Sequence, residues 1–200
     1  MRLAIVTLGH VHAEDLAPLT TRFEHLEQLV LDIDPRADLA AHRAEFNRAL
    51  DAASTDWVLV VREREKIDDA LADEIVDAMR ASKAWGFRIR SIPYYAGKPL
   101  RLGRVDGELR LMQRRHVLRR GELAVQGTVV RFSSAFRSVT FASYEEHHEH
   151  LAKRGTRRSP LLRALHFVRY FLGTRTFDRN TLRYLWIEAG FEVDRNAVTA

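Results

Sequence analysis

The chain has 200 residues, no cysteine and a formal net charge of +5. The lack of cysteine excludes disulfide bonds and thiolate metal sites, and no apolar run approaches the roughly 20 residues that a membrane-spanning helix needs. The charge is uneven. Residues 1–100 hold 13 Lys or Arg against 17 Asp or Glu, whereas residues 101–200 hold 19 against 10. An anionic partner is therefore expected for the second half.

The first half predicts short apolar strands separated by helices. The strands are expected at residues 2–8, 28–33 and 56–61. Asp34 and Pro35 are typical of a helix start and precede the third strand, and Leu71, Ile75 and Met79 recur at helical spacing after it. Apolar strands that alternate with helices predict a parallel sheet covered on both faces, with ligands beyond the carboxyl ends of the strands.

The second half has a different pattern. Further strands are expected at residues 84–92, 108–114 and 123–132, and helices follow at 143–155, 159–173 and 178–190. Ser159 and Asp178 are placed as helix caps, and Gly173 and Gly190 as stops. We therefore predict an α/β domain over residues 1–142 and a basic helical extension over residues 143–200.

Six short motifs follow one another between Phe46 and Gly127. They are Asn47-Arg48-Ala49-Leu50, Trp57-Val58-Leu59, Leu71–Ile75, Ala84–Ile89, Tyr95–Arg101 and Arg110-Leu111-Met112. The series resembles glycosyltransferase family 2, in the bacterial branch similar to lipopolysaccharide-core glycosyltransferases. The resemblance implies a GT-A fold, which is a Rossmann-like, mostly parallel α/β sheet. It also implies a nucleotide-sugar donor and a glycan or lipid-linked acceptor.

The chain departs from that family where a metal is expected. In the family an Asp-Ala-Asp-Glu run after the third strand carries Mg²⁺ or Mn²⁺, which prefer oxygen ligands. Here Arg62 and Arg64 stand at the two aspartate positions, and Glu65 is the acid that remains. We therefore expect no metal site and no cofactor, unless other groups compensate for the lost aspartates.

Two interpretations of Arg62 and Arg64 remain open. In the first, the guanidinium groups replace the metal and pair with the donor diphosphate; a continuing strand would project both to one side. In the second, the site has decayed, and the chain is a non-catalytic relative that binds a partner protein or glycan in cell-envelope polysaccharide biosynthesis.

The resemblance also implies roles for other residues. Glu122 and Asp106 are the candidates for the carboxylate that takes the acceptor's proton, although both are also plausible turn residues. The candidates for donor binding, besides Arg62, Arg64 and Glu65, are Thr7, Asp32, Asp34 and Asn47. Asp34 has the alternative role of helix cap.

Acceptor contacts are expected on the loop after residue 92 and on the strand after it. The candidates are Tyr94, Tyr95, Lys98, Arg101, Arg110 and His116. A packed tyrosine pair and a charged surface strand are the alternatives. The run Glu145–His150 places His147 and His150 one helical turn apart, which suits a metal, but a solvated helix face is the preferred interpretation.

Residues 151–183 carry nine Lys or Arg and one acid. Apolar residues at helical spacing accompany them, so this segment either docks on an anionic membrane or packs on the α/β domain. No nucleic-acid-binding motif accompanies the positive charge, so nucleic acid is not expected as a partner. No signal peptide is evident, and we expect a cytoplasmic protein that docks on the inner face of the cell membrane if the basic segment binds lipid.

Overall fold

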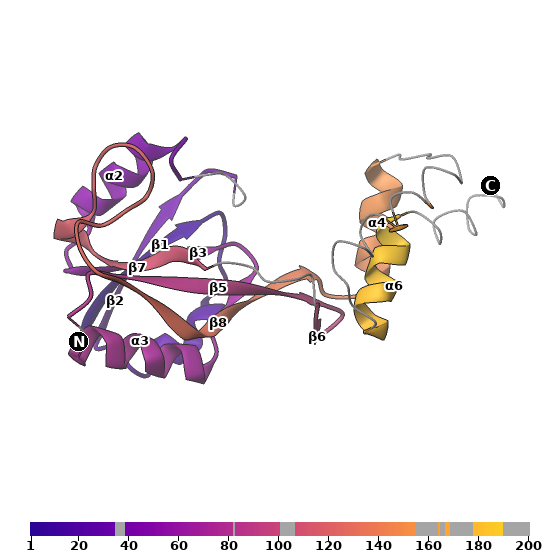
Figure 1. Ribbon diagram of the computed structural model, residues 1–200, viewed down its shortest axis with the longest axis horizontal. Coiled ribbons are helices and arrows are strands. Elements are labelled where there is room, and N and C mark those ends of the chain that lie inside the picture. Colours follow the sequence, from indigo (N-terminus) through magenta and orange to yellow (C-terminus); the bar gives the residue numbers. More distant parts are fainter. Residues whose placement is uncertain are drawn as a thin grey trace. The chain divides into compact units, whose positions relative to one another are not determined.

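The computed structural model describes residues 1–34, 39–81, 83–100, 107–154, 164, 167–168 and 178–189, and these form a mixed α/β fold (Figure 1). The strands are β1 (Arg2–Leu8), β2 (His25–Leu31), β3 (Trp57–Arg62), β4 (Glu65–Lys66), β5 (Gly86–Tyr95), β6 (Lys98–Pro99), β7 (Glu108–Gln113) and β8 (Val129–Phe141). The α-helices are α1 (Ala17–Thr20), α2 (Arg43–Ala52), α3 (Asp69–Ala81), α4 (Tyr144–Arg154) and α6 (Arg179–Glu188). Two short 3₁₀ helices are η1 (Ala13–Leu16) and η2 (Arg114–His116).

The strands join into one sheet in the order β2-β1-β3-β7-β5-β8-β4, and β6 pairs with β5. β1 runs parallel to both β2 and β3. β7 runs antiparallel to β3 and to β5, and β4 runs antiparallel to β8. The predicted parallel arrangement is thus confirmed for the first three strands, and the later strands extend the sheet in the antiparallel sense.

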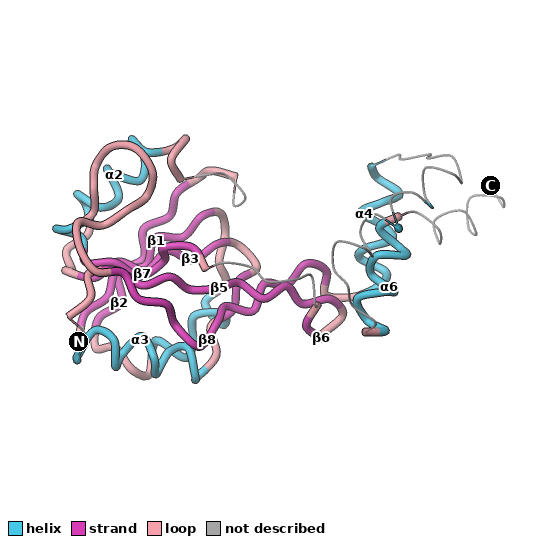
Figure 2. The backbone as a smooth tube through the Cα atoms, in the orientation of Figure 1, coloured by secondary structure: helices cyan, strands magenta, loops and turns pink. Residues whose placement is uncertain are grey.

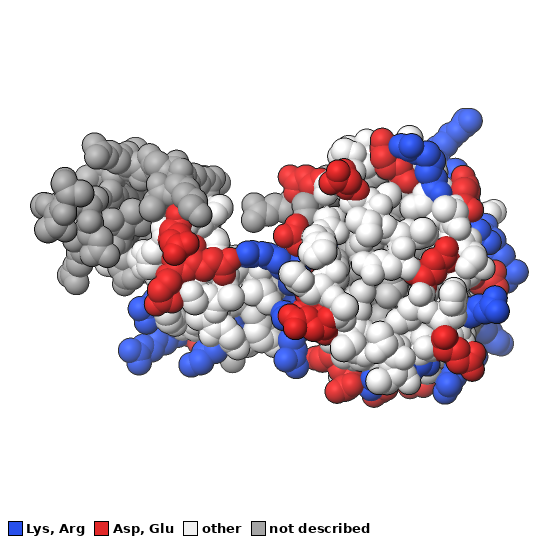
Figure 3. All heavy atoms as spheres, turned by 180° about the vertical axis from the view of Figure 1, so that it is seen from behind, with Lys and Arg blue, Asp and Glu red and all other residues white. Residues whose placement is uncertain are grey.

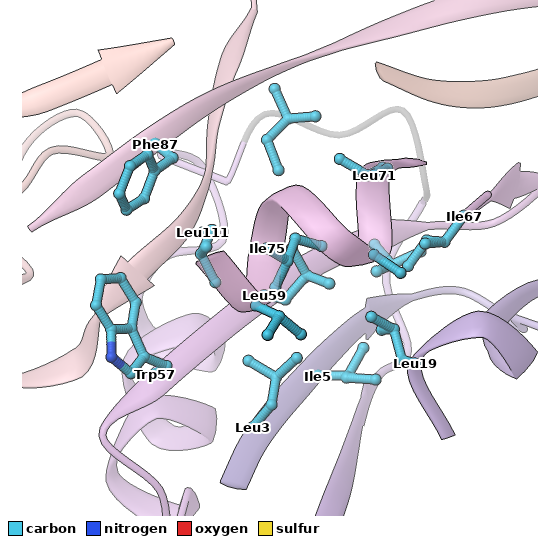
Figure 4. Packing of buried hydrophobic residues seen from close by; sticks show 14 of the residues in the cluster. Leu3, Ile5, Leu19, Trp57, Leu59, Ile67, Leu71, Ile75, Phe87 and Leu111 are labelled. Carbon is cyan, nitrogen blue, oxygen red and sulfur yellow. The ribbon is translucent and has the colours of Figure 1, made fainter. Parts of the chain in front are cut away.

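Helices cover both faces of the parallel strands, as the sequence predicts. Because side chains alternate along a strand, Leu3 and Ile5 of β1 face one core and Ala4 and Val6 face the other. The first core includes Leu19 of α1 and Leu71 and Ile75 of α3, and Figure 4 shows Ile75 beside Leu59. The second includes Phe46 and Leu50 of α2. Figure 2 shows the strands as a layer between α2 and α3.

The apolar strand β3 lies inside this sheet. Residues 57–61 are all buried, because β1 and β7 flank the strand and helices cover both of its faces. Each fully buried aliphatic side chain of this kind stabilises the fold by about 1.5–3 kcal/mol. The strand can therefore be apolar at every position, as parallel strands of covered sheets are.

Some predicted boundaries differ from the structure. β2 begins at His25, three residues before the predicted strand. The helix expected from Asp34 begins instead at Arg43. The strand predicted at 123–132 lies at Val129–Phe141, since Gly127 has a φ of 140° and residues 117 and 125 pair in a separate bridge. α4 and α6 confirm the helices expected from Ser143 and Asp178.

The chain divides into two compact units. The first consists of Met1–Ser91 and Asp106–Ser138, and the second of Ile92–Val105 and Val139–Ala200. In the second unit, a small core contains Tyr95, Phe141 and Ile187. Asp178 caps α6 by accepting hydrogen bonds from the backbone and hydroxyl of Thr181. The division predicted between residues 142 and 143 stays a prediction.

The face of the molecule shown in Figure 3 carries side chains of both signs. On the larger body in this view, they lie around a central area without Lys, Arg, Asp or Glu. Charges of both signs are therefore mixed on this face. An electrostatic nucleic-acid footprint, in contrast, is a broad field of one sign. Within the described residues, we find no helix with the length and apolar content needed to cross a membrane.

Candidate functional site

The carboxyl ends of β1 and β3 meet at one edge of the sheet. Leu8 pairs with Arg62 across the two strands, and the backbone N–H of Glu63 donates to the Leu8 carbonyl at 2.9 Å. After β1 the chain continues to β2, which lies on one side of β1. After β3 it continues to β4, which lies on the other side of the sheet. Such a reversal is a topological switch point, outside which open α/β sheets bind ligands. This edge is the candidate site.

A turn at the end of β3 carries the two arginines that the sequence singled out. β3 ends at Arg62, the chain turns at Glu63 and Arg64, and β4 begins at Glu65. Arg64 is exposed and has a φ of 64°, a left-handed conformation that costs a non-glycine residue about 1 kcal/mol or more. The strand therefore does not continue to Arg64, and the alternation expected to project both arginines to one side does not apply.

Glu65 is buried beneath this turn. Its Oε1 accepts hydrogen bonds from Ser91 Oγ at 2.9 Å and from Arg110 Nη2 at 3.1 Å. Its Oε2 accepts from the backbone N–H of Arg62 at 2.8 Å and from Arg110 Nη1 at 3.3 Å. Four donors thus surround the carboxylate, and Glu65 fixes the turn to β5 and β7.

A β-bulge places Arg110 against Glu65. Phe87 pairs with Leu111 and Arg88 with Leu109, so Arg110 is the extra residue in β7. Bulges re-aim side chains in this way. The Arg110 side chain is 3% exposed, and its guanidinium lies 5.6 Å from the centre of the Phe136 ring. Burial lowers the pKa of Arg110, and the neighbouring charges of Glu65 and Glu108 oppose this shift.

Glu108, at the start of β7, completes the cluster. One of its carboxylate oxygens lies 2.9 Å from Arg62 Nη2 and 3.1 Å from Arg110 Nη2. Arg62, Glu65, Glu108 and Arg110 together carry two positive and two negative formal charges. We call these four residues the edge cluster. They bring together three of the residues that the sequence proposed, Arg62, Glu65 and Arg110.

The edge cluster does not fit a divalent cation. Arg62 and Arg64 are cations, and Glu65 accepts hydrogen bonds from four donors. Elsewhere in the part of the chain that the structure describes, no three His, Asp or Glu side chains gather in a way that could hold a metal.

The other donor-binding candidates are spread over the sheet and α2. Thr7 is buried at the end of β1, and its hydroxyl has no hydrogen-bond partner among the described residues. Asp32 and Asp34 are exposed just after β2. The Asn47 side chain, on α2, donates to the carbonyl of Arg119 at 2.9 Å, so it holds a loop of the protein itself.

Glu122, a candidate base, is not brought together with Arg62. It is exposed on the loop that follows η2. This loop departs from the end of β7 where Gln113 pairs with Trp57, the first residue of β3, whereas Arg62 is the last. Asp106 and Arg101 lie outside the described residues.

The acceptor candidates also separate. His116 stacks on Trp85, with ring centres 3.8 Å apart. Lys98 is exposed on β6, and Tyr94 is half-buried on β5. Tyr95 is fully buried, with its hydroxyl 3.0 Å from His147 Nδ1. This packing favours the alternative of a packed tyrosine.

The expected solvated helix face at His147 is wrong. His147 is fully buried, and its Nε2 lies 2.9 Å from the Glu188 carboxylate. Its ring stacks on Phe141, with centres 4.3 Å apart. His147 is therefore a core histidine, and both of its ring nitrogens have partners. The acids beside it in the sequence suggested an exposed helix face instead.

Sequence reasoning missed two members of the site. Ser91 and Glu108 belong to no motif. They lie on β5 and β7, which pair with each other, and they contact residues that are distant in sequence. The sequence did contain a signal for Glu108. Glu108 and Arg110 are two residues apart at the start of a predicted strand, and this spacing predicts that both side chains lie on one side of it.

Comparison with known proteins assigns no family. No protein-family model matches the chain, and no curated protein matches it. Among solved structures, the chain is similar to a crystal structure of residues 1–349 of Staphylococcus aureus TarS. The identity is 10%, the match covers 98% of this chain and 74% of that one, and the TM-score is 0.42. A TM-score of this size is too low to carry a fold or a function over to this chain.

Proposed function

We propose that the protein binds the diphosphate of a nucleotide sugar outside the carboxyl ends of β1 and β3, and that it serves sugar transfer to a glycan or lipid-linked acceptor. The observation that carries the proposal is the position of Arg62 at the switch point between these strands. The resemblance of residues 46–127 to glycosyltransferase family 2 supports the class of donor.

The guanidinium groups would replace the divalent ion in this proposal. Guanidinium pairs with phosphate oxygens through two parallel hydrogen bonds. The backbone of Arg62 is held by Glu65, whose carboxylate accepts a hydrogen bond from the Arg62 N–H. Arg64 is exposed two residues later, on the same turn. Both arginines thus come from one turn, and the proposal requires their side chains to reach the same diphosphate.

Isothermal titration with uridine diphosphate and guanosine diphosphate tests this proposal. In EDTA, we expect micromolar binding of one of them by the wild-type protein, and at least a tenfold loss in the double variant Arg62→Ala, Arg64→Ala. The matched control is Arg48→Ala, Arg80→Ala, which removes two exposed arginines from α2 and α3. A wild-type protein that binds neither nucleotide, with or without Mn²⁺, would contradict the proposal.

A non-catalytic binding protein is the second candidate. Two observations favour it. The Glu65 carboxylate already accepts hydrogen bonds from the protein, and Glu122 lies on a loop that begins near the first residue of β3, whereas Arg62 is the last. Neither acid is placed to take a proton from an acceptor near Arg62. Donor hydrolysis and transfer assays separate the two candidates, because nucleotide binding without any turnover supports the second.

We also propose that the basic C-terminal segment docks on an anionic membrane. The nine Lys or Arg residues between 151 and 183 support this, since each basic residue near such a surface contributes about 1 kcal/mol. A lipid-linked acceptor would then lie in the same membrane as the protein, and docking on the cytoplasmic face of the membrane is part of this proposal.

A further inference from the structure

Glu108 holds an unusual position in the edge cluster. One carboxylate oxygen contacts the Nη2 atoms of two different arginines, Arg62 at 2.9 Å and Arg110 at 3.1 Å. A phosphoryl oxygen bridging two guanidinium groups would have the same charge sign and similar donor distances. The Glu108 oxygen therefore marks a point where the protein is built to hold an anionic oxygen.

Arg110 and the backbone of Arg62 are held independently of Glu108. Glu65 binds Arg110 through both Nη atoms and binds the backbone N–H of Arg62. Ser91 in turn donates to Glu65. Without the Glu108 carboxylate, the edge cluster would keep this framework and would carry a formal charge of +1 instead of zero.

Glu108, in contrast, is placed so that it can leave. Its side chain is 57% exposed, whereas those of Arg62 and Arg110 are 19% and 3% exposed. An exposed carboxylate regains its hydration when it swings out, and Glu65 still pairs with Arg110 after Glu108 has left. Arg110 is buried and Arg62 is half-buried, so an incoming anion would displace the exposed Glu108 carboxylate and not the guanidinium groups.

We infer that Glu108 is a built-in competitor of the ligand, and that a phosphoryl oxygen of a pyrophosphate group replaces its carboxylate between Arg62 and Arg110. This rests on the proposed function, and it adds Arg110 as a phosphate-binding residue and Glu108 as a residue that limits affinity. Because only the fraction of molecules with Glu108 displaced is competent to bind, the apparent affinity is reduced by that fraction.

Titration with inorganic pyrophosphate in EDTA tests the inference on the full chain. Glu108→Gln keeps the size of the side chain and removes its charge, and we expect it to bind pyrophosphate about fivefold more tightly than the wild type does. Asp77→Asn removes one exposed carboxylate from α3 and controls for net charge; its affinity should match the wild type. The gain should disappear in Glu108→Gln combined with Arg62→Gln.

The outcomes separate this inference from the proposed function. Equal or weaker pyrophosphate binding by Glu108→Gln overturns the inference, and so does a gain that Asp77→Asn reproduces or that persists without the Arg62 side chain. If the wild type binds uridine or guanosine diphosphate through Arg62 while Glu108→Gln brings no gain, the proposed function stands and the inference fails. If no variant binds pyrophosphate, the inference fails, and the nucleotide titration alone decides the proposed function. Circular dichroism of each variant confirms that it is folded.

Discussion

At the residue scale, Glu65 is the side chain on which the candidate site depends most. The sequence presented it as the surviving acid of a metal-binding run, whereas the structure surrounds it with four hydrogen-bond donors. Its buried partner Arg110 has no access to water that could replace the carboxylate. Glu65 thus serves the framework of the candidate site.

This role predicts a large loss of stability when the Glu65 charge is removed. Glu65→Gln leaves the Arg110 guanidinium buried with less compensation, and breaking a buried pair in this way costs about 3–5 kcal/mol. Urea unfolding measures the change. Glu63→Gln, on the exposed part of the same turn, should stay within about 0.5 kcal/mol of the wild type. Equal effects of the two variants would show that Glu65 is not a structural centre.

A second prediction concerns Gly127, where only glycine fits. Its φ is 140°, and an added Cβ would lie 2.1 Å from the Trp85 ring, which itself stacks on His116. Gly127→Ala should therefore cost about 3 kcal/mol through strain and overpacking. The control is Gly121→Ala, which has a φ of 73° but open space around it and should cost about 1 kcal/mol. Chemical unfolding of both variants compares them, and a smaller cost at Gly127 would contradict the packing described.

At the element scale, one carboxylate joins α3 to β8. Glu74 accepts hydrogen bonds from the backbone N–H groups of Ser133 and Ser134, both at 2.8 Å, and from the Ser133 hydroxyl. Burial works against the charged carboxyl, but these donors outweigh it and lower the pKa of Glu74. Ser133 and Ser134 are polar residues within β8, and this contact holds that part of the strand against α3.

The lowered pKa of Glu74 predicts a pH-dependent contribution to stability. Because the folded pKa lies below the unfolded value of about 4.3, the stabilisation is present above that pH and is lost as the pH falls through the folded pKa. Glu74→Gln should cost about 2 kcal/mol at pH 7, and the difference from the wild type should shrink below about pH 4. Urea unfolding at pH 7, 5 and 3 measures it. A difference that stays constant with pH would rule out the carboxylate as its source.

At the scale of the whole molecule, the chain has an uneven charge and two compact units. The first unit contains the edge cluster, in which positive and negative charges balance. The second contains a small aromatic core in which Tyr95 and His147 are buried. The excess of basic residues belongs to the C-terminal part of the chain, so an anionic surface is expected to attract the molecule through that part.

Vesicle co-sedimentation tests the membrane proposal. The bound fraction of the full chain should rise with the content of phosphatidylserine and fall between low and physiological salt, because the attraction is electrostatic and screened within a Debye length. Vesicles of phosphatidylcholine alone are the control. Binding that is independent of anionic lipid would remove the membrane from the proposed function.

The sequence by itself determined the parts of this protein that depend on local pattern. The apolar runs of β1 and β3, the helical spacing of Leu71 and Ile75, and the cap at Asp178 each carry their structural signal within a few residues. The sequence also identified Arg62 as the residue at the end of a buried strand. These features depend on burial and on hydrogen bonds between residues that are close in sequence. The spacing of apolar residues along the chain is therefore enough to predict them.

Only the tertiary structure decided what the charged residues do. The contact of Glu108 with Arg62 spans 46 residues, and the burial of Arg110 depends on a bulge that pairing of β5 and β7 creates. His147 lies in a run of acids and histidines, yet Tyr95 and Phe141 enclose it. A charged side chain has the same appearance in sequence whether it is solvated or paired, because its counter-charge is supplied by strands that become neighbours only in the folded sheet.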